Sequence, residues 1–113
     1  MVDVNPVSLR TVGEDQLAAA RSAPAGRSAQ TVYGGRGRML RQTVLALAAG
    51  NRLDDHDSPG EATLLVLIGK VELGSAAGAV TAAEGDYLPI PDERHNLQAL
   101  TDSVVLLTVV ARS

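Results

Sequence analysis

Short apolar segments separated by turn residues recur through most of the chain. From about residue 28 onward, runs of Val, Leu, Ile and Ala alternate with clusters of Gly, Pro, Asp, Asn and Ser. The pattern gives eight or nine short strands at nearly even spacing. Such spacing is typical of a β-sandwich or β-barrel. We therefore predict an all-β domain over residues 28–113.

The first 27 residues have a different pattern. The segment "TVGEDQLAAARSA", residues 11–23, is rich in alanine and predicts a short helix. Thr11 is a candidate N-cap, with Glu14 three residues later, and Pro24 follows the helix. We therefore expect residues 1–27 to form an N-terminal extension that carries the helix.

One predicted strand has two clearly different faces. In residues 38–47, alternation places Arg41 and Gln42 on opposite sides, so one of them is expected to point into the interior. The segments "ATLLVLIG" and "VVLLTVVA" are apolar on both faces, so both faces are expected to be covered.

Composition excludes several functions. Tyr33 and Tyr87 are the only aromatic residues, so the protein has no stacking platform for bases, and its net charge of -3 also argues against nucleic-acid binding. No apolar run reaches the roughly 18 residues typical of a membrane span. The N-terminus lacks the apolar region of a secretory signal, so we expect a cytoplasmic protein. The chain has no cysteine, which excludes disulfides and thiol catalysis.

Charge is distributed unevenly along the chain. Residues 1–53 hold seven arginines and three acids, a net charge of +4, whereas residues 54–113 hold three bases and ten acids, a net charge of -7. The two halves could pair with each other, within one chain or across a dimer. The alternative is that both sets of charges are solvated, since exposed pairs are weak.

Two segments resemble the conserved motifs of the cupins. "GNRLDDHDSPGEATLLVLIG", residues 50–69, is similar to the first motif, and "GDYLPIPDERHN", residues 85–96, is similar to the second. The resemblance implies a double-stranded β-helix, the jelly-roll barrel of RmlC-like proteins, preceded here by a short helix. It also implies a dimer and, as in many cupins, one divalent metal ion inside the barrel.

The departures from these motifs affect the metal ligands. His56 takes the place of the first histidine, and His95 takes the place of the histidine in the second motif. Ser58 stands where the family has its second histidine, and Ala62 stands where it has glutamate. Two of the four family ligands therefore remain.

A second register of the first motif is also possible. It uses an aspartate in place of the first histidine and makes Glu61 the acidic ligand beside His56 and His95. Such a set would suit one Zn, Mn, Fe or Ni ion. However, Glu61 neighbours Ala62, and adjacent strand residues face opposite sides, so this register requires a bulge at residues 59–60. The first register, without tight metal binding, is preferred.

The resulting hypothesis is a small-molecule-binding cupin with a partly lost metal site. Its aliphatic interior would offer His56, His95, Ser58 and Gln42 as ligand-binding groups. The alternative to ligand binding is that each histidine has a purely structural role, as a buried ring whose polar atoms are hydrogen-bonded. The aspartates around His56 are expected to form a solvated turn.

Two enzyme hypotheses remain open beside it. One is a metal-dependent cupin enzyme of the oxygenase, isomerase or lyase class, in which His56 and His95 bind the ion with Glu61. The other is a metal-free enzyme that moves protons between His95 and Glu93. In every case we expect a homodimer, because the doubly apolar strands need cover and the chain has few helices. In that dimer the arginine-rich hairpin around residues 36–38 would pair with the acidic second half of the chain.

Overall fold

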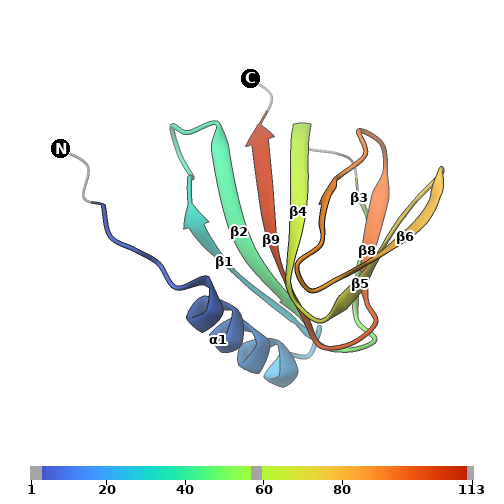
Figure 1. The fold of residues 1–113 in the computed structure, drawn as a ribbon, viewed down its shortest axis with the longest axis horizontal. Coiled ribbons are helices and arrows are strands. Elements are labelled where there is room, and N and C mark those ends of the chain that lie inside the picture. Colours follow the sequence, from blue (N-terminus) through green and yellow to red (C-terminus); the bar gives the residue numbers. More distant parts are fainter. Residues whose placement is uncertain (1–3, 57–59, 112–113) are drawn as a thin grey trace.

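The computed structural model describes residues 4–56 and 60–111, which form two facing antiparallel sheets and one helix (Figure 1). The five-stranded sheet consists, in spatial order, of β1 (Arg27–Tyr33), β2 (Leu40–Leu47), β9 (Ser103–Ala111), β4 (Gly60–Ile68) and β7 (Tyr87–Pro89). The four-stranded sheet consists of β3 (Arg52–His56), β8 (His95–Ala99), β5 (Lys70–Ser75) and β6 (Gly78–Ala83). The predicted all-β jelly-roll architecture is confirmed.

Strand β3 is an element that the sequence analysis did not predict. A solvated turn was expected at Asp54, Asp55 and Asp57. The turn is wrong for residues 54 and 55, which belong to a strand that pairs with β8, although Asp54 is exposed as expected; residue 57 lies outside the described residues. Leu53 lies opposite Leu97 and packs against the core, whereas Asp54 is exposed and forms an ion pair with Arg52 at 3.3 Å. Arg52 and Asp54 therefore lie on the exposed side of a strand that is fixed by long-range pairing.

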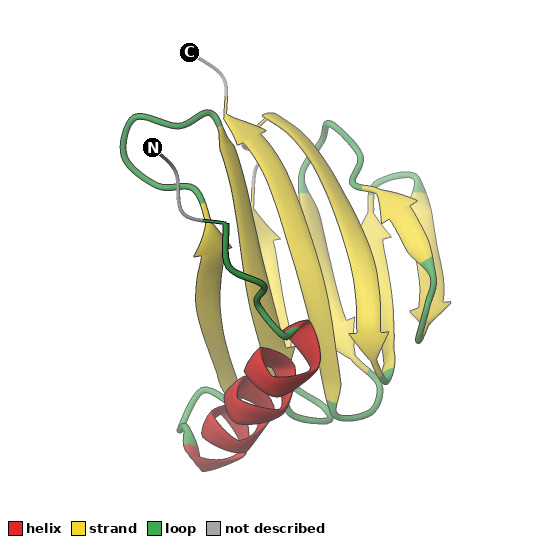
Figure 2. Ribbon diagram, turned by 60° about the vertical axis from the view of Figure 1, so that its left-hand side comes forward, coloured by secondary structure: helices red, strands yellow, loops and turns green. Residues whose placement is uncertain are grey.

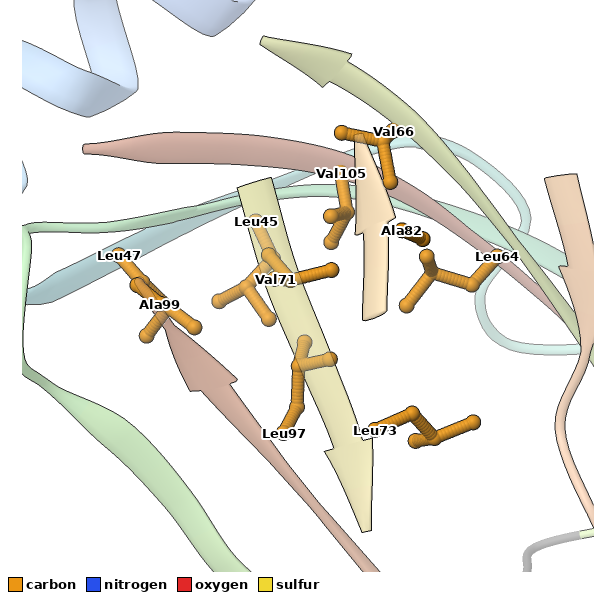
Figure 3. Packing of buried hydrophobic residues seen from close by; sticks show 10 residues of the cluster. All are labelled: Leu45, Leu47, Leu64, Val66, Val71, Leu73, Ala82, Leu97, Ala99 and Val105. Atoms are coloured by element: carbon orange, nitrogen blue, oxygen red, sulfur yellow. The ribbon is translucent and has the colours of Figure 1, made fainter. Parts of the chain in front are cut away.

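The main core lies between the two sheets and is entirely aliphatic (Figure 3). Alternate residues of each strand point inward, as the period of two requires. Each fully buried leucine or valine contributes about 1.5–3 kcal/mol by leaving water. The ten residues of this cluster are Leu45, Leu47, Leu64, Val66, Val71, Leu73, Ala82, Leu97, Ala99 and Val105.

The helix α1 (Leu9–Ser22) lies outside the barrel, across the outer face of the five-stranded sheet (Figure 2). Its Leu17 and Ala20 pack against residues of β2 and β9 in a second, smaller core. The N-cap is Ser8 rather than the predicted Thr11, so the helix begins three residues earlier than a Thr11 cap would place it. The Ser8 hydroxyl accepts a hydrogen bond from the Thr11 N–H at 3.2 Å. None of the described residues forms a helix long and apolar enough to cross a membrane.

Asp102 connects the end of α1 to the barrel. One of its carboxylate oxygens accepts from the Ala49 N–H at 2.8 Å, and the other contacts the Arg21 guanidinium, with Nη2 at 2.7 Å. The Ala49 N–H and the Arg21 side chain hold the pKa of Asp102 below its ordinary value of 3.8. This pair joins the basic half of the sequence to the acidic half within one chain, which is one instance of the pairing that the charge distribution left open.

The link between β4 and β5 is a single residue, Gly69, with φ at +84°. A Cβ at this position would lie 2.2 Å from the Asp102 carbonyl oxygen, so the tight approach requires glycine. The turn expected at residues 69–70 is therefore confirmed, and it packs against the same β8–β9 turn that anchors the helix.

Candidate functional site

The pairing of β3 with β8 places the two histidines of the chain opposite each other. The Cα atoms of His56 and His95 are partners in the antiparallel register, after an irregularity that begins at Leu53. The positions of the two cupin-motif histidines are therefore adjacent in the four-stranded sheet. The side chain of His56 lies outside the described part of the structure.

His95 is a buried polar residue, with 3% of its surface exposed. Its Nδ1 lies 2.9 Å from the Glu93 carbonyl oxygen. A carbonyl can only accept, so Nδ1 carries the proton, and in the neutral ring the lone pair is on Nε2. This contact uses the Glu93 backbone rather than the Glu93 carboxylate, so it gives no support to a proton-moving pair between the two side chains.

A small cavity of about 30 Å³ lies between the sheets beside His95. Such a volume holds about one water molecule or one methyl group. Among the described residues that line it, His95 alone has a polar side chain. The others are the aliphatic residues Leu45, Leu53, Leu64, Leu73, Ile90, Leu97, Val105 and Leu107.

Leu53 and Ile90 were not among the site residues predicted from the sequence. Leu53 belongs to the unpredicted strand β3, and Ile90 follows the short strand β7. The apolar residues at alternate positions in "YLPIP" were the only signal for Ile90.

Ala62, which occupies the glutamate position of the first cupin motif, faces the interior of the barrel. Ala62 is 8% exposed and pairs with the buried Val109 of β9, on the same side of β4 as Leu64. Glu61 is exposed and lies on the other side of β4. The geometry is that of the preferred register, in which Ala62 occupies the glutamate position and Glu61 does not face the interior.

Gln42 lies on the outer face of β2 and not toward the cavity. It shares that face with Val44, which packs beneath α1, and its Nε2 donates to the Thr108 hydroxyl at 3.2 Å. Arg41 has the inward-facing position and is exposed. Of the predicted binding residues, the structure therefore separates Gln42 from the interior, while Ser58 lies outside the described residues.

The described side chains do not form a metal centre by themselves. They contain no group of three or more His, Asp or Glu residues that could hold an ion. Inside the barrel they supply the imidazole of His95, with His56 opposite it along the backbone and Ala62 at the acidic position. A tightly held divalent ion needs further ligands than these.

Comparison with solved structures places the fold. The chain is similar to a conserved protein of unknown function from Streptococcus pyogenes, with a TM-score of 0.74 and 22% identity over 100% of this chain and 92% of that chain. It is similar to an RmlC-like cupin protein from Desulfovibrio desulfuricans, with a TM-score of 0.63 and 27% identity over 74% of this chain and 81% of that chain.

A third similar structure is an enzyme. Salicylate 1,2-dioxygenase from Pseudaminobacter salicylatoxidans matches with a TM-score of 0.74 and 17% identity, over 88% of this chain and 33% of that chain. No protein-family model and no curated protein matches the sequence.

Proposed function

We propose that this chain, which has the cupin fold, binds a small and mainly apolar molecule between its two sheets without a resident metal ion. In this proposal the imidazole of His95 contacts the polar group of the ligand. The ligand's alkyl end occupies the cavity, and the rest of it lies toward the barrel mouth.

The observation that carries the proposal is the contrast between His95 and its surroundings. A buried imidazole stands at the wall of a cavity whose other described lining residues are aliphatic, and apolar walls with a few polar groups are the usual composition of a small-molecule site. The inward position of Ala62 supports binding without a metal, because the acidic ligand of the family motif is missing there. The cavity volume of about 30 Å³ limits the inserted group to the size of a methyl.

Fragment titration tests ligand binding. We expect n-butanol or butyrate to produce saturable shifts in the methyl NMR signals of Leu64 and Leu97, with a Kd in the millimolar range, about -4 kcal/mol. The substitution His95→Leu should remove the preference for the polar fragment over butane-like probes, and the exposed Leu100→Ala should leave it unchanged. Shifts that stay linear with concentration for both fragments would show that the interior is a closed core.

Metal titration tests the other half of the proposal. Isothermal titration of the untagged protein with Zn²⁺ and Mn²⁺ should show no stoichiometric binding tighter than about 10 μM, since two imidazoles hold an ion poorly. Stoichiometric Zn²⁺ binding that is lost in His95→Ala would overturn metal independence. The metal-dependent enzyme, of the oxygenase, isomerase or lyase class, would then be the better proposal.

We also propose that the protein is cytoplasmic, as expected from the sequence. Fractionation of the native cells, with a cytoplasmic and an exported marker protein, would test it.

A further inference from the structure

A groove lies on the outer face of the five-stranded sheet, on the side of the sheet away from His95. Its volume is about 350 Å³, and its floor is the second half of β4, with Leu65, Leu67 and Ile68. Leu9 and Arg10 of α1 line it together with Glu84 and Gly85 of the β6–β7 turn. We call this surface the outer groove.

The two charged residues of the outer groove stand on opposite walls. The helix lies over β2 and β9, on one side of β4, and contributes Arg10. The β6–β7 turn lies on the other side, where the Gly85 N–H donates to the Val66 carbonyl, and contributes Glu84. The groove therefore has an apolar floor between one cation and one anion.

Neither charge is paired within the described part of the chain. Arg10 and Glu84 are exposed, and neither forms an ion pair among the described residues. Arg10 also stands in the first turn of α1, which holds no acidic residue and where the helix dipole disfavours a positive charge. Its charge therefore does not serve the stability of the helix.

Apolar residues extend the surface beyond the outer groove. Tyr87 pairs with Leu65 across the β4–β7 ladder, on the same face, and is 63% exposed. Val7, just before the helix, is 53% exposed. A stable dimer buries about 1,200–2,000 Å² in total, so the groove needs these flanking residues to form an interface.

We propose that the outer groove is a two-fold self-association surface, in which Arg10 of each copy pairs with Glu84 of the other. A two-fold interface is self-complementary, because any contact between two different residues occurs twice. A patch with one cation and one anion on opposite sides of an apolar floor meets this requirement. The pairing joins the basic half of one chain to the acidic half of its partner, as the charge distribution of the sequence allows.

Charge reversal tests the assignment, with the full chain studied by sedimentation at micromolar concentrations. The wild type should be a dimer, and Arg10→Glu and Glu84→Arg should each raise the dimer dissociation constant at least tenfold. The double variant should recover the wild-type constant. An equimolar mixture of the two single variants should form heterodimers, because both of its cross-pairs are complementary.

Matched reversals at exposed sites away from the groove serve as controls. Glu14→Arg, on α1, and Arg36→Glu, on the β1–β2 turn, should leave the dimer intact. If a single reversal fails to fold, Tyr87→Ala replaces it and should also weaken the dimer at least tenfold.

Three results would overturn the proposal. They are a monomeric wild type, a dimer unaffected by the groove variants, and single variants that the double variant does not rescue. Since the groove and His95 are on opposite faces of the sheet, none of these outcomes bears on ligand binding in the interior.

Discussion

Leu64→Ala should be among the most damaging single truncations in this protein. Leu64 is 1% exposed, lies at the centre of β4 and lines the cavity beside His95. Buried Leu→Ala substitutions cost about 2.7–5.0 kcal/mol, and the cost rises with the volume left empty. Here the removed atoms border an existing void between two sheets that are fixed by their hydrogen bonds, so little collapse is expected. We therefore expect a loss of about 4 kcal/mol.

That loss is large but does not unfold the protein. A domain of this length has a total stability of roughly 6–17 kcal/mol. With about 4 °C per kcal/mol, the melting temperature should fall by about 16 °C. With a urea m-value of about 2 kcal/mol/M, the unfolding midpoint should fall by about 2 M.

The assay is urea unfolding followed by far-UV circular dichroism, at one fixed protein concentration so that any association is constant. Val80→Ala, at a position that is 55% exposed, is the matched control and should change stability by less than about 1 kcal/mol. A loss below about 1 kcal/mol for Leu64→Ala at an unchanged m-value would refute the reasoning. It would mean that the inner face of β4 is not tightly packed.

Three further predictions concern the turns and the helix. Gly69→Ala should cost more than about 2 kcal/mol in urea unfolding, from backbone strain plus the clash with the Asp102 carbonyl. Gly50→Ala, with a similar φ of +85° and nothing within 4 Å, should cost only the strain, about 1 kcal/mol. Because the folded-state pKa of Asp102 is lowered, its contribution is present above the ordinary value of 3.8 and is lost as the pH falls below it. Asp102→Asn should therefore reduce the drop in urea midpoint between about pH 6 and pH 3, and an unchanged drop would exclude this carboxylate as a source. Ser8→Ala should lower stability by about 1 kcal/mol through loss of the N-cap, while Thr11→Ala should have little effect, as measured by thermal melting. Equal losses of stability in Ser8→Ala and Thr11→Ala would show that Ser8 is not the N-cap of the helix.

Local alternation sorted the residues of β2 into two faces but did not show which face is inside, and the prediction of Gln42 as an interior binding group is wrong. Polar Gln42 and apolar Val44 both lie on the outer face, and Leu45 points inward, as the period of two requires. Strand β3 was not predicted because aspartates, here Asp54 and Asp55, have low strand propensity. What makes this segment a strand is its pairing with β8, 39 to 46 residues further along the chain, and no local pattern contains that information.

The candidate site was predictable only in part, for a similar reason. Resemblance to two motifs placed His56 and His95 on separate segments, and the ladder makes them partners. The sequence left open whether Glu61 or Ala62 faces the interior, because a one-residue slip turns every side chain of a strand to the other face. Only the register of β4 against β9 distinguishes the two, and this register depends on the whole sheet.

Because the aliphatic core leaves both tyrosines on the surface, the protein's intrinsic fluorescence will report on its periphery. Tyr33 is 47% exposed and stacks with the Arg38 guanidinium at 5.6 Å, and Tyr87 stands beside the outer groove. With no tryptophan in the chain, emission will respond weakly to melting of the interior. Replacing Tyr33 with leucine would leave Tyr87 as a single label-free optical probe of what approaches that side of the sheet.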